Sequence, residues 1–153
     1  MQLKSLSFLV LLLIFASGCA GGPPKRVFPP ELSLQELRTE GEQWVAVFRL
    51  NSFSDVAMTL QRFDLQFALG EQSAQTVVLD STLTVSARSV ELLDWRFTPS
   101  DAWRAEVASA INLRRSLKYR LEGEIRFSEP SRQFDIEYNS ALGPVPGLSG
   151  VLR

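Results

Sequence analysis

The side chains that could do chemistry in this sequence are of few kinds. The chain has 153 residues with 17 acidic and 16 basic side chains, one cysteine and no histidine. Without histidine it lacks the usual general base near neutral pH, the histidine of a catalytic triad and the commonest zinc ligand. Any catalysis would therefore rest on carboxylates, Lys, Ser or Tyr. The formal net charge of -1 also argues against nucleic acid as a partner, because binding it needs an excess of Lys and Arg.

Three pairs of acidic residues lie close together in the sequence. They are Glu40 with Glu42, Glu91 with Asp94, and Glu122 with Glu124. The last pair would point to the same side of a strand. Because Arg120 and Arg126 flank that pair on the same side, we interpret it as part of a solvated face of mixed charge. No loop carries the dense run of oxygen ligands of a calcium site, and no Gly-rich phosphate loop follows a strand. We therefore expect no metal, no cofactor and no enzymatic activity.

Basic and aromatic residues offer two further candidate surfaces. Arg114 and Arg115 follow a predicted helix, where positive charge favours the helix C-terminus. Contact with phosphate head groups is the alternative for this pair. Trp44, Trp95 and Trp103 fall at strand and helix spacing, so we interpret them as core residues and not as an aromatic binding surface.

The single cysteine, Cys19, ends a segment that is typical of a signal peptide. Residues 6–15 form an almost unbroken apolar run, too short to cross a bilayer but suited to secretion. Ala16, Ser17 and Gly18 follow, and together with Cys19 they resemble a bacterial lipobox, in which signal peptidase II cuts before an acylated cysteine. Ala16 stands where Leu is most usual. The alternative is an ordinary signal peptide whose cysteine is incidental.

Lipidation at Cys19 would anchor the chain to a membrane. Stable anchoring needs two or more acyl chains, and the resemblance implies three. No Asp follows the cysteine, which by bacterial sorting rules favours the outer membrane, with the domain facing the periplasm. We predict a signal peptide over residues 1–18, the lipidated cysteine and a flexible tether over 19–30, and one domain over 31–153.

Most of the domain alternates between apolar and polar residues with period two. This pattern is typical of antiparallel strands with one face in the core. The apolar phase slips by one residue near Gln61 and Arg62, which predicts a bulge. Many short strands with turns between them predict an immunoglobulin/fibronectin-like antiparallel β-sandwich of about seven strands. The segments concerned are 32–37, 44–50, 58–69, 76–79, 83–85, 93–97, 117–127 and 134–138.

One short helix is predicted between the strands. Thr98 would be its N-cap, Pro99 its first residue and Asp101 the acid of a capping box. Trp103 begins an apolar stripe at helical spacing, and Asn112 would end the helix. The stripe is narrow, so we expect the helix to lie on the surface of the sandwich.

Several segments occur in an order that is similar to a known family. They are Pro30–Leu34, Val45–Asn51, Phe63–Gly70, Leu117–Gly123 and Gly143–Gly147. Together they resemble the type 2 late embryogenesis abundant family, whose module is also called the water stress and hypersensitive response domain. The resemblance spans most of residues 30–147, including a late strand that reads Tyr-x-Leu-x-Gly. The chain departs from it after Asn51, where Ser52 and Phe53 replace Pro-Asn. Strand-end Asn is more often a turn-former than a ligand.

The resemblance implies a small β-sandwich with one helix, no catalytic residues, and a role in desiccation and stress protection. Bacterial members are often lipoproteins. We therefore expect a non-enzymatic, lipid-anchored envelope protein that protects under water stress. The alternative is a binding or assembly lipoprotein that holds an envelope protein through a strand edge or an aromatic cleft.

Overall fold

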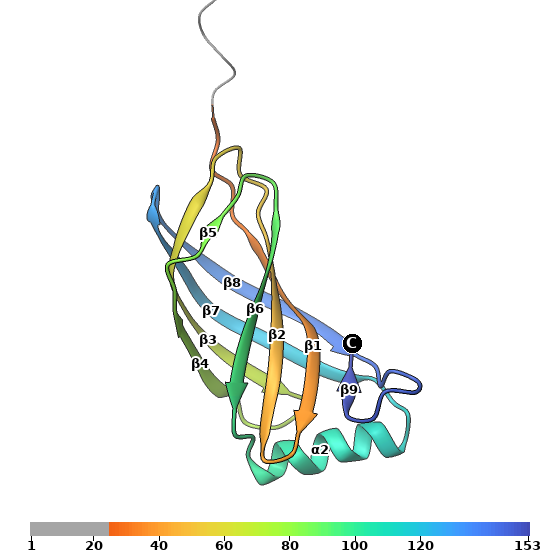
Figure 1. Cartoon of the computed structure of the whole chain (residues 1–153). Helices are drawn as coiled ribbons and strands as arrows, with labels where there is room; N and C mark the ends of the chain where they lie inside the picture. Colours follow the sequence, from red (N-terminus) through yellow and green to blue (C-terminus); the bar gives the residue numbers. More distant parts are fainter. Residues whose placement is uncertain (1–24) are drawn as a thin grey trace, which may run out of the picture.

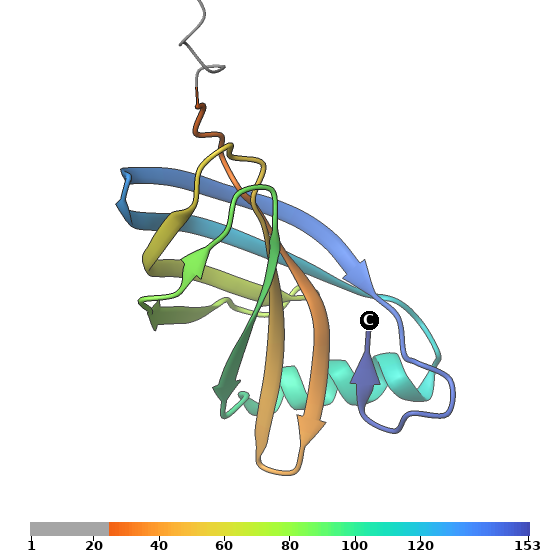
Figure 2. The same cartoon turned by 45° about the horizontal axis from the view of Figure 1, so that its top comes forward.

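The computed structural model describes residues 25–153. In this part, nine strands and one helix form two antiparallel sheets that pack face to face (Figure 1, Figure 2). The elements are β1 (Glu31–Glu40), β2 (Gln43–Asn51), β3 (Met58–Leu69), β4 (Gln75–Asp80), β5 (Thr84–Val85), β6 (Val90–Phe97), α2 (Asp101–Asn112), β7 (Leu117–Glu129), β8 (Ser131–Leu142) and β9 (Val151–Leu152). The first sheet has the order β6-β2-β1-β9; the second has the order β4-β3-β7-β8, with β5 beside β3.

This architecture confirms the all-β sandwich with one helix. The described residues hold nine strands where the sequence pattern predicts about seven. Two of them, β5 and β9, are two residues long. The segment 83–85, which the sequence pattern predicts as a strand, corresponds to β5, whereas β9 has no signal in the sequence. After β8 ends, the chain turns through the Pro- and Gly-containing segment 143–150 and returns to pair β9 with β1.

The core fills the space between the two sheets. In β7 the alternation predicted from sequence is confirmed, because Leu117, Tyr119, Leu121, Ile125 and Phe127 are buried while the residues between them face solvent. Burying each large apolar side chain contributes about 1.5–3 kcal/mol. The hydrophobic contact between the sheets is therefore the main source of the fold's stability.

Aromatic rings connect the layers of this core. Phe48 of the first sheet packs edge-to-face against Phe63 and Phe67 of the second, with ring centroids 5.7 and 5.9 Å apart. Trp103 from the helix packs against Phe67 at 4.9 Å. Such pairs contribute about 0.5–1.5 kcal/mol beyond the area they bury. The helix is thus part of the same core as the two sheets.

The predicted bulge in β3 is confirmed. The register of β3 against β7 shifts on both sides of Leu60, where Gln61 is left without a partner. An extra residue in one strand reverses the side on which later side chains lie. Leu60 and Phe63 are therefore both fully buried although they are three residues apart.

A second bulge lies in β1, between Leu34 and Glu36. It has the same effect, because Leu34 and Leu37 both reach the core while Glu36 turns to the outer face. Tyr119 of the opposite sheet binds the backbone here. Its hydroxyl accepts a hydrogen bond from the Leu34 N–H at 3.1 Å and donates one to the Leu34 carbonyl at 3.3 Å. The two sheets are therefore joined by a buried polar contact as well as by hydrophobic packing.

The helix α2 closes one end of the sandwich, opposite the end at which residue 25 lies (Figure 1). It begins later than predicted, because Ser100 and not Thr98 is the N-cap: its hydroxyl accepts from the Trp103 N–H at 3.3 Å. Thr98 and Pro99 continue the extended chain that leaves β6. The predicted end at Asn112 is confirmed.

The C-terminus of α2 is a Schellman-type cap. The Arg115 N–H donates to the Ala110 carbonyl and the Arg114 N–H to the Ile111 carbonyl, which is the pattern of that motif. Arg114 occupies its left-handed position with a φ of 50°, where Gly is usual. The Arg115 side chain turns back along the helix to Glu106 at 2.8 Å. The polar contacts of the Arg115 side chain are thus with α2 itself, as the sequence predicts.

Candidate functional site

The residues predicted for lipid attachment lie outside the described part of the chain. These are Cys19 with the recognition residues Ala16, Ser17 and Gly18. The described residues begin at Lys25, within the predicted tether, and the chain then leads directly into β1. The candidate sites within residues 25–153 are the two outer faces of the sandwich and the clefts at its two ends.

The outer face of the first sheet carries a network of ion pairs centred on Arg38. Its guanidinium contacts Glu36, Glu40 and Asp94 at 3.2, 3.3 and 3.6 Å. Arg153, the last residue, reaches Glu36 at 2.5 Å. Glu36 is buried, so its carboxylate depends on these two arginines in place of water.

The same network covers apolar side chains. Val45 and Val47 lie on the outer face of β2, beside Arg38 and Glu36 in the register of β1, yet they are 0% and 6% exposed. The aliphatic part of an arginine covers apolar surface while its charged head stays at the water boundary. Both faces of this sheet are therefore largely dry at its centre.

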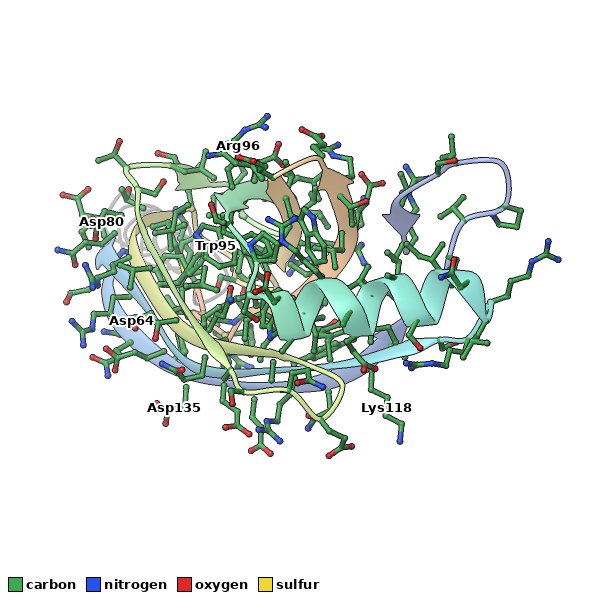
Figure 3. The ribbon with its side chains drawn as sticks, turned by 90° about the horizontal axis from the view of Figure 1, so that it is seen from below. Asp64, Asp80, Trp95, Arg96, Lys118 and Asp135 are labelled. Atoms are coloured by element: carbon green, nitrogen blue, oxygen red, sulfur yellow. The ribbon has the colours of Figure 1, made fainter. Side chains whose placement is uncertain are left out.

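The outer face of the second sheet is polar along its length. Figure 3 shows Asp64, Lys118 and Asp135 pointing away from this sheet into solvent. Arg62 binds Asp64 at 3.2 Å and Asp80 at 3.0 Å, and these two carboxylates raise the pKa of its guanidinium. This face therefore offers paired charges to solvent.

Five of the six carboxylates in the acidic pairs considered for catalysis contact another side chain. Glu122 pairs with Arg120 at 2.9 Å, and Glu124 pairs with Arg126. This is the mixed-charge face that the sequence predicts. Glu40 and Asp94 belong to the Arg38 network. Glu91 accepts from the Ser89 hydroxyl. The contact of Glu42 with Arg104 is made by the Glu42 backbone carbonyl and not by its carboxylate. Within residues 25–153, no group of three or more His, Cys, Asp or Glu is placed to hold a metal ion.

The three tryptophans are core residues or rest against the core. Trp44 and Trp103 are 4% and 0% exposed, and the Trp103 indole N–H donates to the Ser73 carbonyl at 3.0 Å. Trp95 is half-buried and stacks on Phe97 with ring centroids 4.2 Å apart. The sequence interpretation of these residues as core is therefore confirmed.

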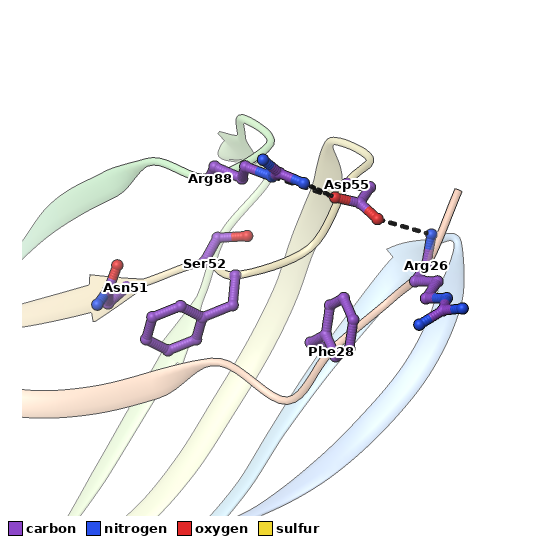
Figure 4. Close-up of a pocket in the computed structure, with 7 residues that line it drawn as sticks. Arg26, Phe28, Asn51, Ser52, Asp55 and Arg88 are labelled. Atoms are coloured by element: carbon purple, nitrogen blue, oxygen red, sulfur yellow. Dashed lines mark hydrogen bonds and ion pairs between the residues drawn. The ribbon is translucent and has the colours of Figure 1, made fainter. Parts of the chain in front are cut away.

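A cleft lies at the end of the sandwich where the tether joins it, and we call it the tether-end cleft (Figure 4). Its volume is about 650 Å³. It is formed by the chain before β1 and by the loops after β2 and β5. The lining residues are Arg26, Phe28, Asn51, Ser52, Phe53, Asp55 and Arg88.

Four hydrogen bonds hold the chain before β1 in this cleft. The buried Ser54 hydroxyl accepts from the Phe28 N–H at 2.9 Å and donates to the Phe28 carbonyl at 3.1 Å. The Asp55 N–H donates to the Arg26 carbonyl at 2.8 Å, and the Arg26 N–H donates to the Asp55 carboxylate at 3.3 Å. Residues 26–28 are therefore bound to the loop that follows β2.

Asp55 connects this chain to the third segment of the cleft. Its carboxylate accepts from Arg88 at 2.5 and 3.1 Å. The hydrogen bond from Arg88 holds the pKa of Asp55 below its usual range, assisted by the Arg26 N–H. Arg88 itself has a φ of 52°, an uncommon conformation for a residue with a side chain. The Asp55–Arg88 pair thus fixes the two loops beside the incoming tether.

Asn51 differs from its expected role. It is half-buried and stays in register with both neighbours of β2, opposite Glu31 and Val90. It does not have the left-handed conformation of a turn-former. The next residue, Ser52, is 1% exposed, and its hydroxyl has no hydrogen-bond partner among the described residues. The chain turns only after these two residues, so Asn51 forms part of the wall of the cleft.

Almost no pattern in the sequence predicts the tether-end cleft. Its residues come from three segments that are far apart in the chain, and none of them forms a motif. The one available signal is the pair of aromatic residues Phe28 and Phe53 outside any period-two pattern. They are 38% and 47% exposed. A second cleft of about 670 Å³ lies near the C-terminus of α2, between Ile111 and the loop 144–151.

No helix among the described residues is long and apolar enough to cross a membrane. No family model matches the sequence, and a search of curated proteins finds no match.

Solved structures do show a similar fold. A solution structure of a candidate late embryogenesis abundant (LEA) protein superimposes with a TM-score of 0.50 at 11% identity, covering 92% of this chain and 86% of the other. A protein from Arabidopsis thaliana gives 0.43 at 14% identity, covering 81% and 82% of the two chains. A protein from Archaeoglobus fulgidus gives 0.42 at 10% identity, covering 78% and 98%. The chain thus has a fold like that of a LEA protein.

Proposed function

We propose that this chain is a non-enzymatic lipoprotein of the bacterial envelope that protects against water stress. In this proposal the acyl chains on Cys19 hold it in the outer membrane, and the domain faces the periplasm. The lipobox-like residues before Cys19 support the anchor. The LEA-like fold supports the protective role, and the ion-paired surface of the domain carries the physical argument for it.

Many charged side chains on the surface of the sandwich are paired with one another. Arg38 on one outer face contacts three carboxylates, and Arg62 on the other contacts two. In water, exposed pairs of this kind contribute only about 0–1 kcal/mol each. Their attraction grows as the dielectric constant of the surroundings falls. Removal of water therefore strengthens the contacts on this surface, so the folded domain is suited to persist as its surroundings dry.

The protective role is tested by drying and rehydrating cells. We expect a deletion strain to lose viability relative to its parent after drying and after osmotic shock, and the intact gene to restore it. Equal survival of the two strains would contradict the proposal. A strain that carries Cys19→Ala tests whether protection needs the anchor, because the domain is unchanged and the predicted site of acylation is lost.

The anchor itself is tested by fractionation and mass spectrometry. Cys19→Ala is expected to leave an unprocessed or mislocalised protein, whereas the control Ala20→Ser should be cleaved and acylated normally. Recovery of cleaved Cys19→Ala in the outer membrane would show that the cysteine is not the anchor.

A second candidate function is that of a lipoprotein that holds an envelope protein. The observation that favours it is β8, a 12-residue strand at the end of the second sheet. Within the described residues its outer edge pairs with no other strand, so it can accept an added strand from a partner. Crosslinking in intact cells tests this candidate. Specific recovery of one envelope protein through β8 would favour it, and recovery of no specific protein would count against it.

A further inference from the structure

We propose that the tether-end surface of the domain lies against an anionic lipid bilayer. This surface consists of Lys25, Arg26, Phe28, Phe53 and Val90, and three of these residues also line the tether-end cleft. The inference deepens the proposed function, because it rests on the anchor at Cys19 and assigns the domain an orientation on the membrane. It follows from three observations: where apolar side chains are exposed, how charge is distributed, and how short the connecting chain is.

Exposed apolar side chains gather at this end. Among the described residues, seven large hydrophobic side chains are exposed. Phe28, Phe53 and Val90 belong to the segments that meet here, and Leu92 follows two residues later on β6. Exposed Phe beside basic residues is typical of surfaces that sit at the boundary between head groups and acyl chains.

The segment that enters the domain has the sign of charge that an anionic bilayer attracts. Lys25 and Arg26 precede the first acidic residue, Glu31, which begins β1, and Glu91 after Val90 is partly buried and accepts from Ser89. Asp55 is neutralised by Arg88 at 2.5 Å. Lys25 and Arg26 are both exposed and lie next to each other, on the tether side of Phe28.

The connecting chain is too short to let this end move far from the membrane. Only five residues separate Cys19 from Lys25, which corresponds to a span of roughly 20 Å at about 3.1–3.6 Å per residue. The hydrogen bonds from Ser54 and Asp55 fix the chain to the domain from Arg26 onward. Since residues 25–30 leave the domain at the end opposite α2 (Figure 2), an anchored chain presents this end to the bilayer and carries α2 away from it.

The experiment uses the chain from Cys19 onward, which retains every core residue. Its single thiol is coupled to a maleimide phospholipid in vesicles of phosphatidylcholine and phosphatidylglycerol, so that the domain is tethered whether or not cells acylate it. Tryptophan is introduced at Phe53→Trp, and at Leu113→Trp as the control. Leu113 is 69% exposed at the end of α2. Quenching by lipids with brominated acyl chains then reports contact with the bilayer.

Brominated lipid should reduce the emission of Phe53→Trp and leave that of Leu113→Trp and of the parent chain unchanged. The parent's own tryptophans lie toward the α2 end: Trp44 and Trp95 contact Phe97, and Trp103 is in the helix. Equal quenching of the two variants, or none, would overturn the proposal. Failure of acylation in cells would instead appear in the mass of the protein made there, and would leave this result standing.

The charge is tested in the same system. Lys25→Gln with Arg26→Gln should weaken bilayer contact by about fivefold for each basic residue lost, since each contributes about 1 kcal/mol near an anionic surface. The quenching of Phe53→Trp should fall accordingly. Vesicles of phosphatidylcholine alone should have a similar effect. Quenching that is undiminished in both cases would overturn the assignment of anionic lipid.

Discussion

Replacing Tyr119 by Phe tests whether the polar contact between the sheets stabilises the fold. The change removes one hydroxyl from a residue that is 5% exposed and leaves its ring in place. The N–H of Leu34 then loses its partner at 3.1 Å, and its carbonyl loses one at 3.3 Å. A buried polar group without a partner costs about 1–3 kcal/mol. We expect the free energy of unfolding to fall by about that amount.

Urea denaturation, followed by tryptophan fluorescence, measures this change. Tyr138→Phe is the matched control. Its ring stacks on that of Tyr119 with centroids 6.3 Å apart, but its hydroxyl takes no part in the contact with Leu34. A loss in Tyr119→Phe no larger than in Tyr138→Phe would refute the reasoning, because the bulge in β1 would then need no support from the second sheet.

The same contact predicts a dependence on alkaline pH. Burial raises the pKa of Tyr119, so the folded state holds the phenolic proton more tightly than the unfolded chain does. This contribution to stability is fully present below the unfolded pKa of about 10 and is lost as the pH rises through the folded pKa. The difference in stability between the parent and Tyr119→Phe should therefore shrink above about pH 10. A difference that grows with pH would contradict the sign of this argument.

Three further predictions concern the backbone. Gly123→Ala should lower the free energy of unfolding by more than about 3 kcal/mol, because its Cβ would lie 2.2 Å from a carbonyl oxygen of β3. Gly41→Ala is the control, because a Cβ there meets open space. It should cost only about 1–2 kcal/mol in the same urea titration. Arg114→Gly should stabilise by about 1 kcal/mol by relieving the left-handed position of the helix cap, and an unchanged melting temperature would argue against strain there. Ser54→Ala should speed hydrogen exchange at the Phe28 amide by about tenfold while the exchange of the core strands changes little; unchanged exchange at Phe28 would mean that the tether is held by other contacts.

The sequence was sufficient for the strands but not for the surfaces they form. Period two along β7 predicts which residues are buried because one face of that strand meets the core and the other meets water. The one-residue shift of the apolar positions near Gln61 likewise predicts a bulge, because it interrupts the local alternation of apolar and polar residues. The predicted helix start is wrong because the local pattern suits Thr98 as an N-cap, whereas the Trp103 N–H donates to the Ser100 hydroxyl and Thr98 lies in the extended chain before it.

The tether-end cleft could not be predicted for a different reason. It depends on contacts such as that of Ser54 with Phe28, which are 26 residues apart, and of Asp55 with Arg88, which are 33 apart. No local pattern encodes such pairs.

The resemblance of the late strand to Tyr-x-Leu-x-Gly is explained by the structure: Tyr119 binds the bulge of β1, Leu121 is core, and Gly123 permits close approach of β3. Each of these residues has a structural role.

The pairing of β1 with β9 has a consequence for the order of folding. The first strand of the domain pairs with the last one, and β3 pairs with β7 across a long intervening stretch of chain. Contacts between distant parts of a sequence slow folding, because the intervening loop must close before the contacts form. The edge of β1 stays open until residues 151–152 are available to cover it. The edge of β1 is therefore shielded from pairing with another chain only after its long-range contact with β9 has formed.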